Sequence, residues 1–307
     1  MTELEKRVKE YLDYLEIEKN RSPKTRENYG RYLSVFLAFA KIKIPREITA
    51  ELVRDFRLRL ARHSVNGETL KKNTQAYYVI ALRNFLKYLI KRDEKNVLSP
   101  DKIELPKTPS RQIDAVEYSE LERILAAPQG NNPRVLRDRA ILETLFSTGL
   151  RLSELCALNR YLDLERGEIS VRGKGDKLRV VFLSDSAKRT IKEYLGKRGD
   201  AEEALFISLT KSNRKVGEPP KAIGRITPRA VQRLVDFYAR KAGIGRRVHP
   251  HSFRHSFATD LLINGADLRS VQELLGHSNV NTTQIYTHLT NKELREIHRA
   301  FHGKRRN

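Results

Sequence analysis

Apolar residues recur at the spacing of an amphipathic helix through the first third of the chain. This spacing predicts helices over residues 4–15, 23–39 and 70–91. A further helix is expected after Thr49, whose hydroxyl can cap a helix N-terminus. Asn66-Gly67 marks a turn. Because no strand pattern interrupts these helices, we expect a compact all-α bundle.

Helical spacing returns after residue 114, in shorter segments. We expect one helix capped by Ser119, a second that begins at Pro133 and closes at Gly149, and a third entered at Arg151 with Ser153 as its cap. The neighbours of Arg151 in the chain are leucines, so its side chain should lie beside a core. An arginine in that position is usually paired or binds an anion.

The period then changes from that of a helix to that of a strand. Residues 168–172 and 178–183 alternate as two antiparallel strands do, and the segment 173–176 between them has the composition of a tight turn. Further helices are expected over residues 184–195 and after Thr227, which precedes a proline. The predicted fold class is therefore mainly α with a small antiparallel β-sheet.

Two stretches lack periodicity. The prolines and polar residues of 100–113 predict a linker between an N-terminal domain, 1–99, and a C-terminal domain, 114–307. Within the second domain, residues 210–225 have the composition of a flexible insertion. The C-terminal half is therefore expected to be an α+β domain that follows an all-α one.

The chain is strongly basic. Its 307 residues include 60 Lys and Arg against 38 Asp and Glu, a net charge of +22. The excess is +10 before residue 112 and +12 from there on, so it is not confined to a tail. Both halves are expected to contact a polyanion, and DNA or RNA is the leading candidate. The alternative is a soluble protein that is merely basic.

Other features of the composition bear on where in the cell the protein is expected. The apolar content of 39% supports packed cores, and no stretch approaches the roughly 20 apolar residues of a membrane span. The N-terminus is charged and amphipathic, unlike a signal peptide. The single cysteine, Cys156, excludes an intramolecular disulfide. We expect a soluble, cytoplasmic protein with no contact to a membrane.

Candidate chemistry is concentrated in residues 249–289, which hold five of the eight histidines. His251 and Arg254 are three residues apart, so on a helix they share one face. His277 follows a helix-ending Leu-Leu-Gly, and Tyr286 lies in a short segment beyond it. Imidazoles, a guanidinium and a phenol in a very basic chain indicate phosphate chemistry on a nucleic acid.

The same histidines could also indicate a zinc site. His249, His251 and His255 are close in the sequence, but no cysteine lies nearby and acidic residues are sparse. We therefore expect no metal, with His255 in a structural role and His288 near the reacting groups but without a part in the chemistry.

Five motifs together resemble the tyrosine recombinases, the lambda-integrase family, and most closely its Xer-type site-specific recombinases. The resemblance covers the whole chain, and the motifs occur in order at compatible spacing. They are Thr148-Gly149-Leu150-Arg151-Leu152-Ser153-Glu154-Leu155, Gly173-Lys174-Gly175, His251-Ser252-Phe253-Arg254-His255, Leu275-Gly276-His277 and Ile285-Tyr286-Thr287-His288. Phe253 stands where the family most often has leucine, a conservative packing change.

The resemblance implies a covalent mechanism. Tyr286 would attack a phosphodiester, form a 3′-phosphotyrosyl link and release a 5′-hydroxyl, which splits one hard step into two easier ones. Arg151 and Arg254 would bind the non-bridging oxygens and stabilise the transition state.

Three further residues are implied to complete the site. His277 would be a third donor, Lys174 the general acid for the leaving 5′-oxygen, and His251 the acceptor or positioner of the tyrosine proton. Tyrosine has an ordinary pKa of about 10, so nearby cations and a base would help it to ionise. The resemblance implies neither a metal nor another cofactor.

The resemblance to the tyrosine recombinases also implies binding partners. The helical bundle would be a SAM-like core-binding domain, and the two domains would enclose double-stranded DNA at inverted half-sites as a C-shaped clamp. Residues 290–302 would form a capped C-terminal helix that docks on a neighbouring protomer in a tetramer, although its apolar stripe could equally fold back on its own domain. An accessory protein could be required. The outward cations of the bundle that we expect to contact phosphates are Lys24, Arg26, Arg31, Lys71, Lys72, Arg83 and Lys87.

Two rival functions stay open at this point. A type IB topoisomerase-like enzyme uses similar residues but relaxes DNA without exchanging partners. The helical first domain and the terminal helix favour the recombinase. A non-catalytic DNA-binding protein is the other rival, and the presence of all six catalytic residue types disfavours it. The biological role, chromosome-dimer resolution for chromosome segregation or integration of a mobile element, does not follow from the sequence.

Overall fold

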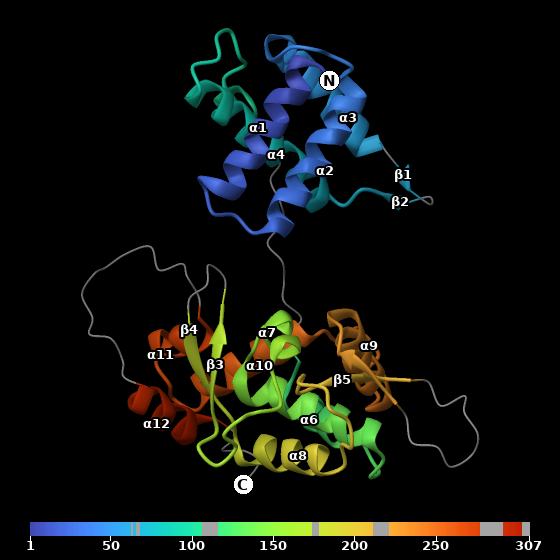
Figure 1. Ribbon diagram of the computed structural model, residues 1–307, viewed down its shortest axis with the longest axis vertical. Helices are drawn as coiled ribbons and strands as arrows, with labels where there is room; N and C mark the ends of the chain where they lie inside the picture. Colours follow the sequence, from blue (N-terminus) through green and yellow to red (C-terminus); the bar gives the residue numbers. More distant parts are fainter. Residues whose placement is uncertain are drawn as a thin grey trace. The chain divides into compact units, whose positions relative to one another are not determined.

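The computed structural model describes residues 1–62, 64–65, 68–105, 116–173, 178–210, 221–276 and 291–302. The chain divides into two compact units, Met1–Arg111 and Gln112–Asn307, each with its own hydrophobic core (Figure 1). Within the described residues, no helix is both long enough and apolar enough to cross a membrane.

The N-terminal unit is built from helices, as the apolar spacing predicts. Leu4, Leu33, Phe56 and Leu82 come from four different helices and are almost fully buried in one core. Thr49 accepts a hydrogen bond from the Leu52 N–H at 3.1 Å, which confirms it as a cap. The helices of the unit are α1 (Glu3–Ile17), α2 (Pro23–Ala40), α3 (Ala50–Arg62) and α4 (Lys72–Lys91), with 3₁₀ turns at Pro45–Glu47 and Pro100–Lys102.

Two details of this unit differ from expectation. A short antiparallel pair, β1 (Ser64–Val65) and β2 (Glu68–Thr69), follows α3 where no strand was predicted, because a two-residue ladder is too short to show a period. The predicted turn at Asn66-Gly67 lies outside the described residues. The turn Pro100–Lys102 packs on α4 and Ile103 is buried in the core, so this unit includes the first residues of the stretch expected to be a linker. The domain boundary stays a prediction.

The C-terminal unit is built around one buried helix. α6 (Pro133–Thr148) is buried at every residue from Ala140 to Thr148 and packs against α8 and α10. A helix that is buried all round is typical of the centre of a domain. Around it lie α5 (Tyr118–Ala126), α7 (Leu152–Ala157), α8 (Asp185–Gly196), α9 (Pro228–Lys241), α10 (Pro250–Ile263), α11 (Leu268–Leu275) and α12 (Asn291–Phe301).

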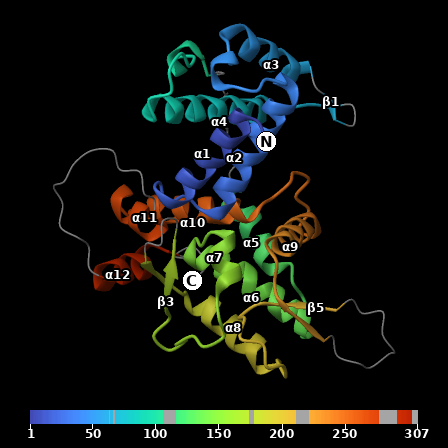
Figure 2. The ribbon, with the colours of Figure 1, turned by 45° about the horizontal axis from the view of Figure 1, so that its top comes forward.

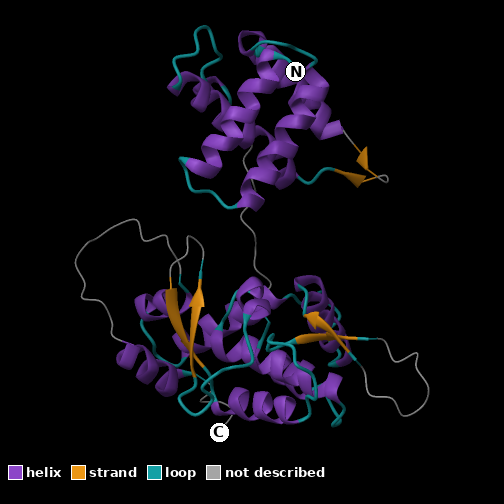
Figure 3. Ribbon diagram, viewed as in Figure 1, coloured by secondary structure: helices purple, strands orange, loops and turns teal. Residues whose placement is uncertain are grey.

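The described strands of this unit form two separate antiparallel pairs (Figure 3). β3 (Glu168–Arg172) pairs with β4 (Leu178–Phe182), and the register Glu168↔Phe182 confirms the two predicted antiparallel strands. The tight turn expected over 173–176 lies, after Gly173, outside the described residues. β5 (Ile207–Leu209) pairs with β6 (Ala222–Arg225). The prediction of a flexible insertion over 210–225 is therefore wrong for its last four residues, because backbone hydrogen bonds from β5 hold a segment whose own sequence has no strand period. Residues 211–220 lie outside the described residues.

Two predicted helix caps are wrong for the same reason. α5 begins at Tyr118, before Ser119, and α7 begins at Leu152, before Ser153. In each case a glutamate in the first turn, Glu120 or Glu154, accepts the N–H of the residue before the helix. The glutamate side chain thus provides an acceptor for a backbone N–H that has none within the helix. The helix can therefore begin before the serine.

The C-terminal helix α12 packs against α10, α11 and β4 of its own chain (Figure 2). His298 is 4% exposed and donates from Nε2 to the Ser147 carbonyl at 2.7 Å. Beside it, His302 Nδ1 lies 3.1 Å from Asp260 Oδ2. Arg295 forms an ion pair with Glu168. The sequence left open where this helix docks, and in the isolated chain it docks on its own domain.

The buried imidazole predicts that acid weakens this docking. Burial, and after it the charge of the neighbouring His302, lower the pKa of His298 to about 3. A histidine whose pKa is lower in the folded state stabilises above its ordinary value, and that stability is lost as the pH falls from about 6.5 toward 3. We expect amide hydrogen exchange over residues 295–302, corrected for the intrinsic rate, to show less protection at pH 5 than at pH 7.5.

The control for this effect is His298→Phe, which keeps a ring of similar size and does not titrate. Because His302 and Asp260 remain in that variant, any pH dependence that they contribute is retained. Equal loss of protection in the variant and the parent would show that His298 is not the group responsible.

Candidate active site

The C-terminal end of α11 is capped by three arginines that come from three other segments of the chain. Arg179 of β4 donates to the Leu274 carbonyl at 3.3 Å. Arg254 of α10 donates to the Leu275 carbonyl at 2.6 Å. Arg151, just before α7, donates to the Gly276 carbonyl at 2.9 Å. The last carbonyls of a helix lack partners within it and carry partial negative charge, so cations stabilise them.

Two glycines with left-handed backbone allow this close approach. Gly276 ends α11 with a φ of +63°, and a Cβ there would lie 2.8 Å from Arg179 Cδ. Gly149 ends α6 with a φ of +57°, and its Cβ would lie 2.5 Å from the ring of Phe257. Gly149 was predicted to end its helix in this conformation, and that prediction is confirmed. Both positions require glycine for space as well as for backbone conformation.

Arg254 is the most deeply placed of the three cations. It is 4% exposed and also donates to the Gly149 carbonyl at 2.6 Å, so it joins the end of α6 to the end of α11. Burial, and after it the charges of Arg151 and Arg179, lower the pKa of Arg254 to about 10. Among the described residues its hydrogen bonds go only to carbonyl oxygens and use two of its five N–H donors.

Glu154 is the carboxylate between the other two arginines. It accepts two bonds from Arg179, at 2.8 and 2.7 Å, and two from Arg151, one from the backbone N–H at 2.7 Å and one from Nη1 at 2.9 Å. Burial alone would raise the pKa of Glu154, but these hydrogen bonds outweigh it and lower the pKa to about 2. Three cations against one carboxylate leave an excess of positive charge.

That excess is open to solvent at one point. The side chain of Arg151 is 32% exposed, while those of Glu154 and Arg179 are 4% and 10% exposed. An anion can therefore reach Arg151 directly, whereas Arg254 is only 4% exposed. Preorganised guanidinium donors in a partly desolvated position are suited to the non-bridging oxygens of a phosphate. Of the residues predicted for catalysis, Arg151 and Arg254 are brought together by their shared contact with the end of α11.

The remaining predicted catalytic residues are placed less completely. His251 lies in the first turn of α10, one turn before Arg254, and its side chain is exposed. Lys174, His277 and Tyr286 lie outside the described residues. The sequence places Lys174 between β3 and β4, and His277 directly after Gly276.

The seven cations predicted to contact DNA lie on α2 and α4, with Lys71 as the residue before α4. Three are already paired with carboxylates: Lys24 with Glu27, Arg26 with Asp13, and Arg83 with Asp101. Within the described part of the chain, the other four have no carboxylate partner. Those four, which are the stronger candidates for phosphate contact, are Arg31, Lys71, Lys72 and Lys87.

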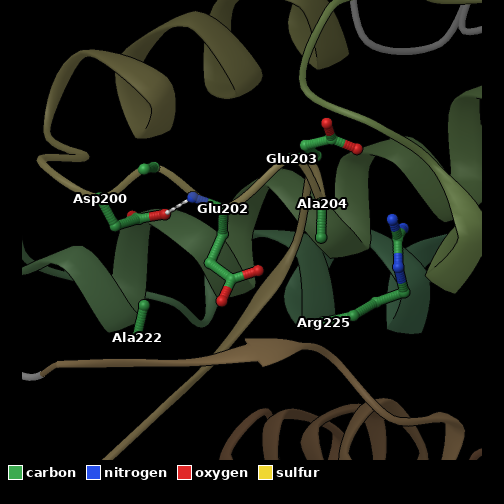
Figure 4. A pocket seen from close by; sticks show the side chains of 7 residues that line it. Asp200, Glu202, Glu203, Ala204, Ala222 and Arg225 are labelled. Atoms are coloured by element: carbon green, nitrogen blue, oxygen red, sulfur yellow. Dashed lines mark hydrogen bonds between the residues drawn. The ribbon is translucent and has the colours of Figure 1, made fainter.

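An open pocket of about 640 Å³ lies elsewhere in the C-terminal unit (Figure 4). It lies beside residues 200–204 and β6, and its side chains include Asp200, Glu202 and Arg225. No predicted site residue lines it. Its acidic lining is unsuited to a nucleic acid, so the arginine cluster remains the candidate site.

The sequence analysis missed the two charged residues that hold the site together. Glu154 was part of a quoted motif, but no role was given to it, and Arg179 was taken only as a strand residue. The spacing of Arg151 and Glu154, three residues apart at a helix start, was a usable signal for an ion pair. Arg179 gave no such signal, since it meets Glu154 only in the folded chain.

Comparison with known proteins shows the family of the chain. Residues 115–293 match the phage integrase family, and residues 8–93 match the N-terminal SAM-like domain of phage integrases. The chain is 38% identical over 311 residues to "Tyrosine recombinase XerC" of Escherichia coli O157:H7 (strain EC4115 / EHEC), covering 99% of this chain and 98% of that one.

Two solved structures have similar folds. A crystal structure of the XerH site-specific recombinase bound to difH substrate, a pre-cleavage complex, is 26% identical with a TM-score of 0.64, covering 94% of this chain and 82% of that one. A lambda integrase (75–356) dimer bound to a COC′ core site is 17% identical with a TM-score of 0.67, covering 94% and 100%. The latter supports the fold alone.

The chain therefore belongs to the phage integrase family. Within that family it is a tyrosine-type site-specific recombinase similar to the Xer proteins, which confirms the class expected from its motifs. The expected combination of a SAM-like helical bundle with a catalytic α+β domain is also confirmed. The topoisomerase-like alternative is not favoured.

The depressed pKa of Glu154 makes a testable prediction about stability. Because that pKa is lower in the folded state, Glu154 stabilises the protein above its ordinary pKa of 4.5, and this stability is lost as the pH falls toward 2. We expect Glu154→Gln to lower the free energy of unfolding by up to about 3 kcal/mol at pH 7 and by roughly half as much at pH 3. Urea unfolding followed by circular dichroism measures both values; an equal effect at the two pH values would contradict the assignment.

Proposed function

We propose that Tyr286 is the nucleophile with which this recombinase cuts and rejoins DNA. Its phenolic oxygen attacks the scissile phosphorus, the bond from phosphorus to the 5′-oxygen breaks, and a 3′-phosphotyrosyl link forms. The phosphoester is conserved in this exchange, so a 5′-hydroxyl from a second DNA site can reverse the step and restore a continuous strand. The family and the position of Tyr286 in a quoted motif support this role.

Arg151 and Arg254 bind the non-bridging oxygens of that phosphate. The observation that carries the proposal is their convergence at the end of α11, with the positive charge only partly balanced by Glu154. The negative charge that develops as the tyrosine attacks meets donors already held in position, so little reorganisation is needed in the transition state.

The proton transfers use the other candidates. Lys174 gives a proton to the leaving 5′-oxygen, and His251 accepts or positions the proton of the Tyr286 hydroxyl. His277 adds a donor to the phosphate, and it follows the three capped carbonyls directly in the chain. In the reverse step the same groups exchange roles, because both directions pass through the same transition state.

The larger assembly is a tetramer on two paired duplex sites, each with inverted half-sites. In it, the face of α10, α11 and β4 that holds α12 would accept the α12 of a neighbouring protomer. The packing of α12 on that face within one chain supports the surface as its receptor. Light scattering that finds no species above a dimer on cognate duplex would argue against this assembly. An accessory protein and a cytoplasmic location belong to the same proposal.

The nucleophile is tested by trapping the covalent intermediate. We expect a suicide duplex, nicked beside the scissile phosphate, to yield a denaturation-resistant protein–DNA adduct in EDTA, and Tyr286→Phe to yield none, because phenylalanine has no oxygen to attack with. The cognate site is first selected from random duplexes by binding. Lack of an adduct with the parent protein on a cleaved cognate site, or an adduct with the variant, would sink the assignment. Exchange between two plasmid sites, as against relaxation of one plasmid, separates recombinase from topoisomerase.

Two of the cations that have no carboxylate partner among the described residues, Lys71 and Lys72, give a prediction about how DNA binding depends on salt. Lys71→Gln with Lys72→Gln should weaken binding to any duplex and reduce the slope of log affinity against log salt by about 2, since each phosphate contact contributes about 0.9. The matched control removes the same charge from another helix, with Lys6→Gln and Lys9→Gln on α1. Fluorescence anisotropy at several salt concentrations measures both slopes, and equal slopes for the two double variants would remove Lys71 and Lys72 from the DNA surface.

A further inference from the structure

Arg179 is a buried arginine of the site to which neither the sequence motifs nor the proposed reaction gives a role. It lies in β4 opposite Val171, and its side chain is 10% exposed. Nη1 and Nη2 donate to the two carboxylate oxygens of Glu154 at 2.8 and 2.7 Å, and Nε donates to the Leu274 carbonyl at 3.3 Å. Each of its three nitrogens thus has a protein acceptor.

These contacts separate Arg179 from the two arginines that bind phosphate. Its charge is matched by the bidentate carboxylate of Glu154, whereas Arg254 has carbonyl partners only among the described residues. The side chain of Arg179 is also 10% exposed, whereas that of Arg151 is 32% exposed. Arg179 is therefore placed to hold other groups and not to touch the substrate.

We propose that Arg179 is a positioning residue for strand cleavage, a role that rests on the proposed function. It holds Glu154 ionised and aligned, so that Glu154 can orient the guanidinium of Arg151. Through the Leu274 carbonyl and its packing against Gly276, it also fixes the end of α11, from which the chain passes to His277. One side chain thus holds both the carboxylate that orients Arg151 and the helix end that Arg151 and Arg254 cap.

Two consequences follow from removing the Arg179 guanidinium. Glu154 keeps only the two bonds from Arg151, so its pKa moves up toward the ordinary value for a glutamate. The Leu274 carbonyl loses its donor, and the packing of the Arg179 side chain against Gly276 is lost. Misplacement of the clamp by as little as about 1 Å can slow a reaction about 100-fold.

The test compares Arg179→Met and Arg179→Lys with a matched control, Arg198→Met. Arg198 is also a buried arginine with a carboxylate and backbone carbonyls as acceptors: Nε donates to Asp200 at 2.9 Å, and Nη1 donates to the Ala204 and Leu205 carbonyls at 2.6 and 2.9 Å. Among the described residues, none of these partners belongs to the arginine cluster or to the helices that carry it. The measurement is the single-turnover rate of adduct formation on the suicide duplex at saturating full-length protein, together with the dissociation constant for the same DNA.

We expect Arg179→Met to slow adduct formation about 100-fold, with an affinity for DNA within about threefold of the parent. Arg179→Lys should recover part of the rate, because an ammonium group supplies the charge but not the two-pronged geometry of a guanidinium. Arg198→Met should lower the melting temperature and leave the rate of the bound protein unchanged. If Arg179→Met does not fold, Arg179→Lys carries the same comparison with a smaller decrease.

The pH profile distinguishes positioning from general destabilisation. In the Arg179 variants, protonation of Glu154 should make the cleavage rate fall further than the parent's as the pH falls below about 5, toward the ordinary glutamate pKa of 4.5, whereas a structural defect would lower the rate by the same factor at each pH. Adding Glu154→Gln to Arg179→Met should cause little further loss, because both changes remove the same support from Arg151.

The inference is overturned if Arg179→Met or Arg179→Lys, folded and bound to DNA, forms the adduct at the parent rate, or if the pH profile keeps the parent's shape. An additive effect of the two substitutions would also overturn it. Failure of the proposed function gives a different result, since the parent protein would then form no adduct, or Tyr286→Phe would still form one.

Discussion

The end of α11 is the constraint on which the site depends. Three successive carbonyls, those of Leu274, Leu275 and Gly276, point out of the helix without partners in it, and each receives a guanidinium from a different segment. The same bonds that satisfy a helix terminus therefore also gather cations from β4, α10 and the start of α7. A structural requirement of the backbone and the assembly of an anion site are met by one set of contacts.

Burying these cations is costly, and within the described residues that cost is only partly offset by a carboxylate. Glu154 balances one charge and is shared by Arg151 and Arg179, while Arg254 is held by carbonyl oxygens alone among the described residues. Positive charge remains in excess, and a phosphate can supply what is missing. A cluster with a carboxylate for every arginine would be better balanced without DNA, and it would have less to offer a phosphate in the transition state.

The terminal helix packs on elements that build this site. α12 covers α10, α11 and β4, the elements that contribute two of the three arginines and the carbonyls they cap. It is held there by a buried neutral imidazole, His298, and by the pairing of His302 with Asp260. Such polar contacts fix where the helix lies, and because they are specific they also suit an identical surface on a second copy of the chain.

The sequence by itself determined what depends on neighbouring residues: the helices through their apolar spacing, the β3–β4 hairpin through its alternation, the helix end at Gly149, and the class of protein through motifs that match in order. Tertiary structure decided what depends on residues far apart. Arg179 and Glu154 are 25 positions apart and meet only when β4 packs beside the start of α7. β6 exists because β5 supplies its hydrogen bonds, and two helices begin before their serines because a glutamate competes for the cap. Periodicity depends on residues that are close in the sequence, so it can be read from the sequence. The partner of a buried charge depends on tertiary packing, so no local sequence pattern predicts it.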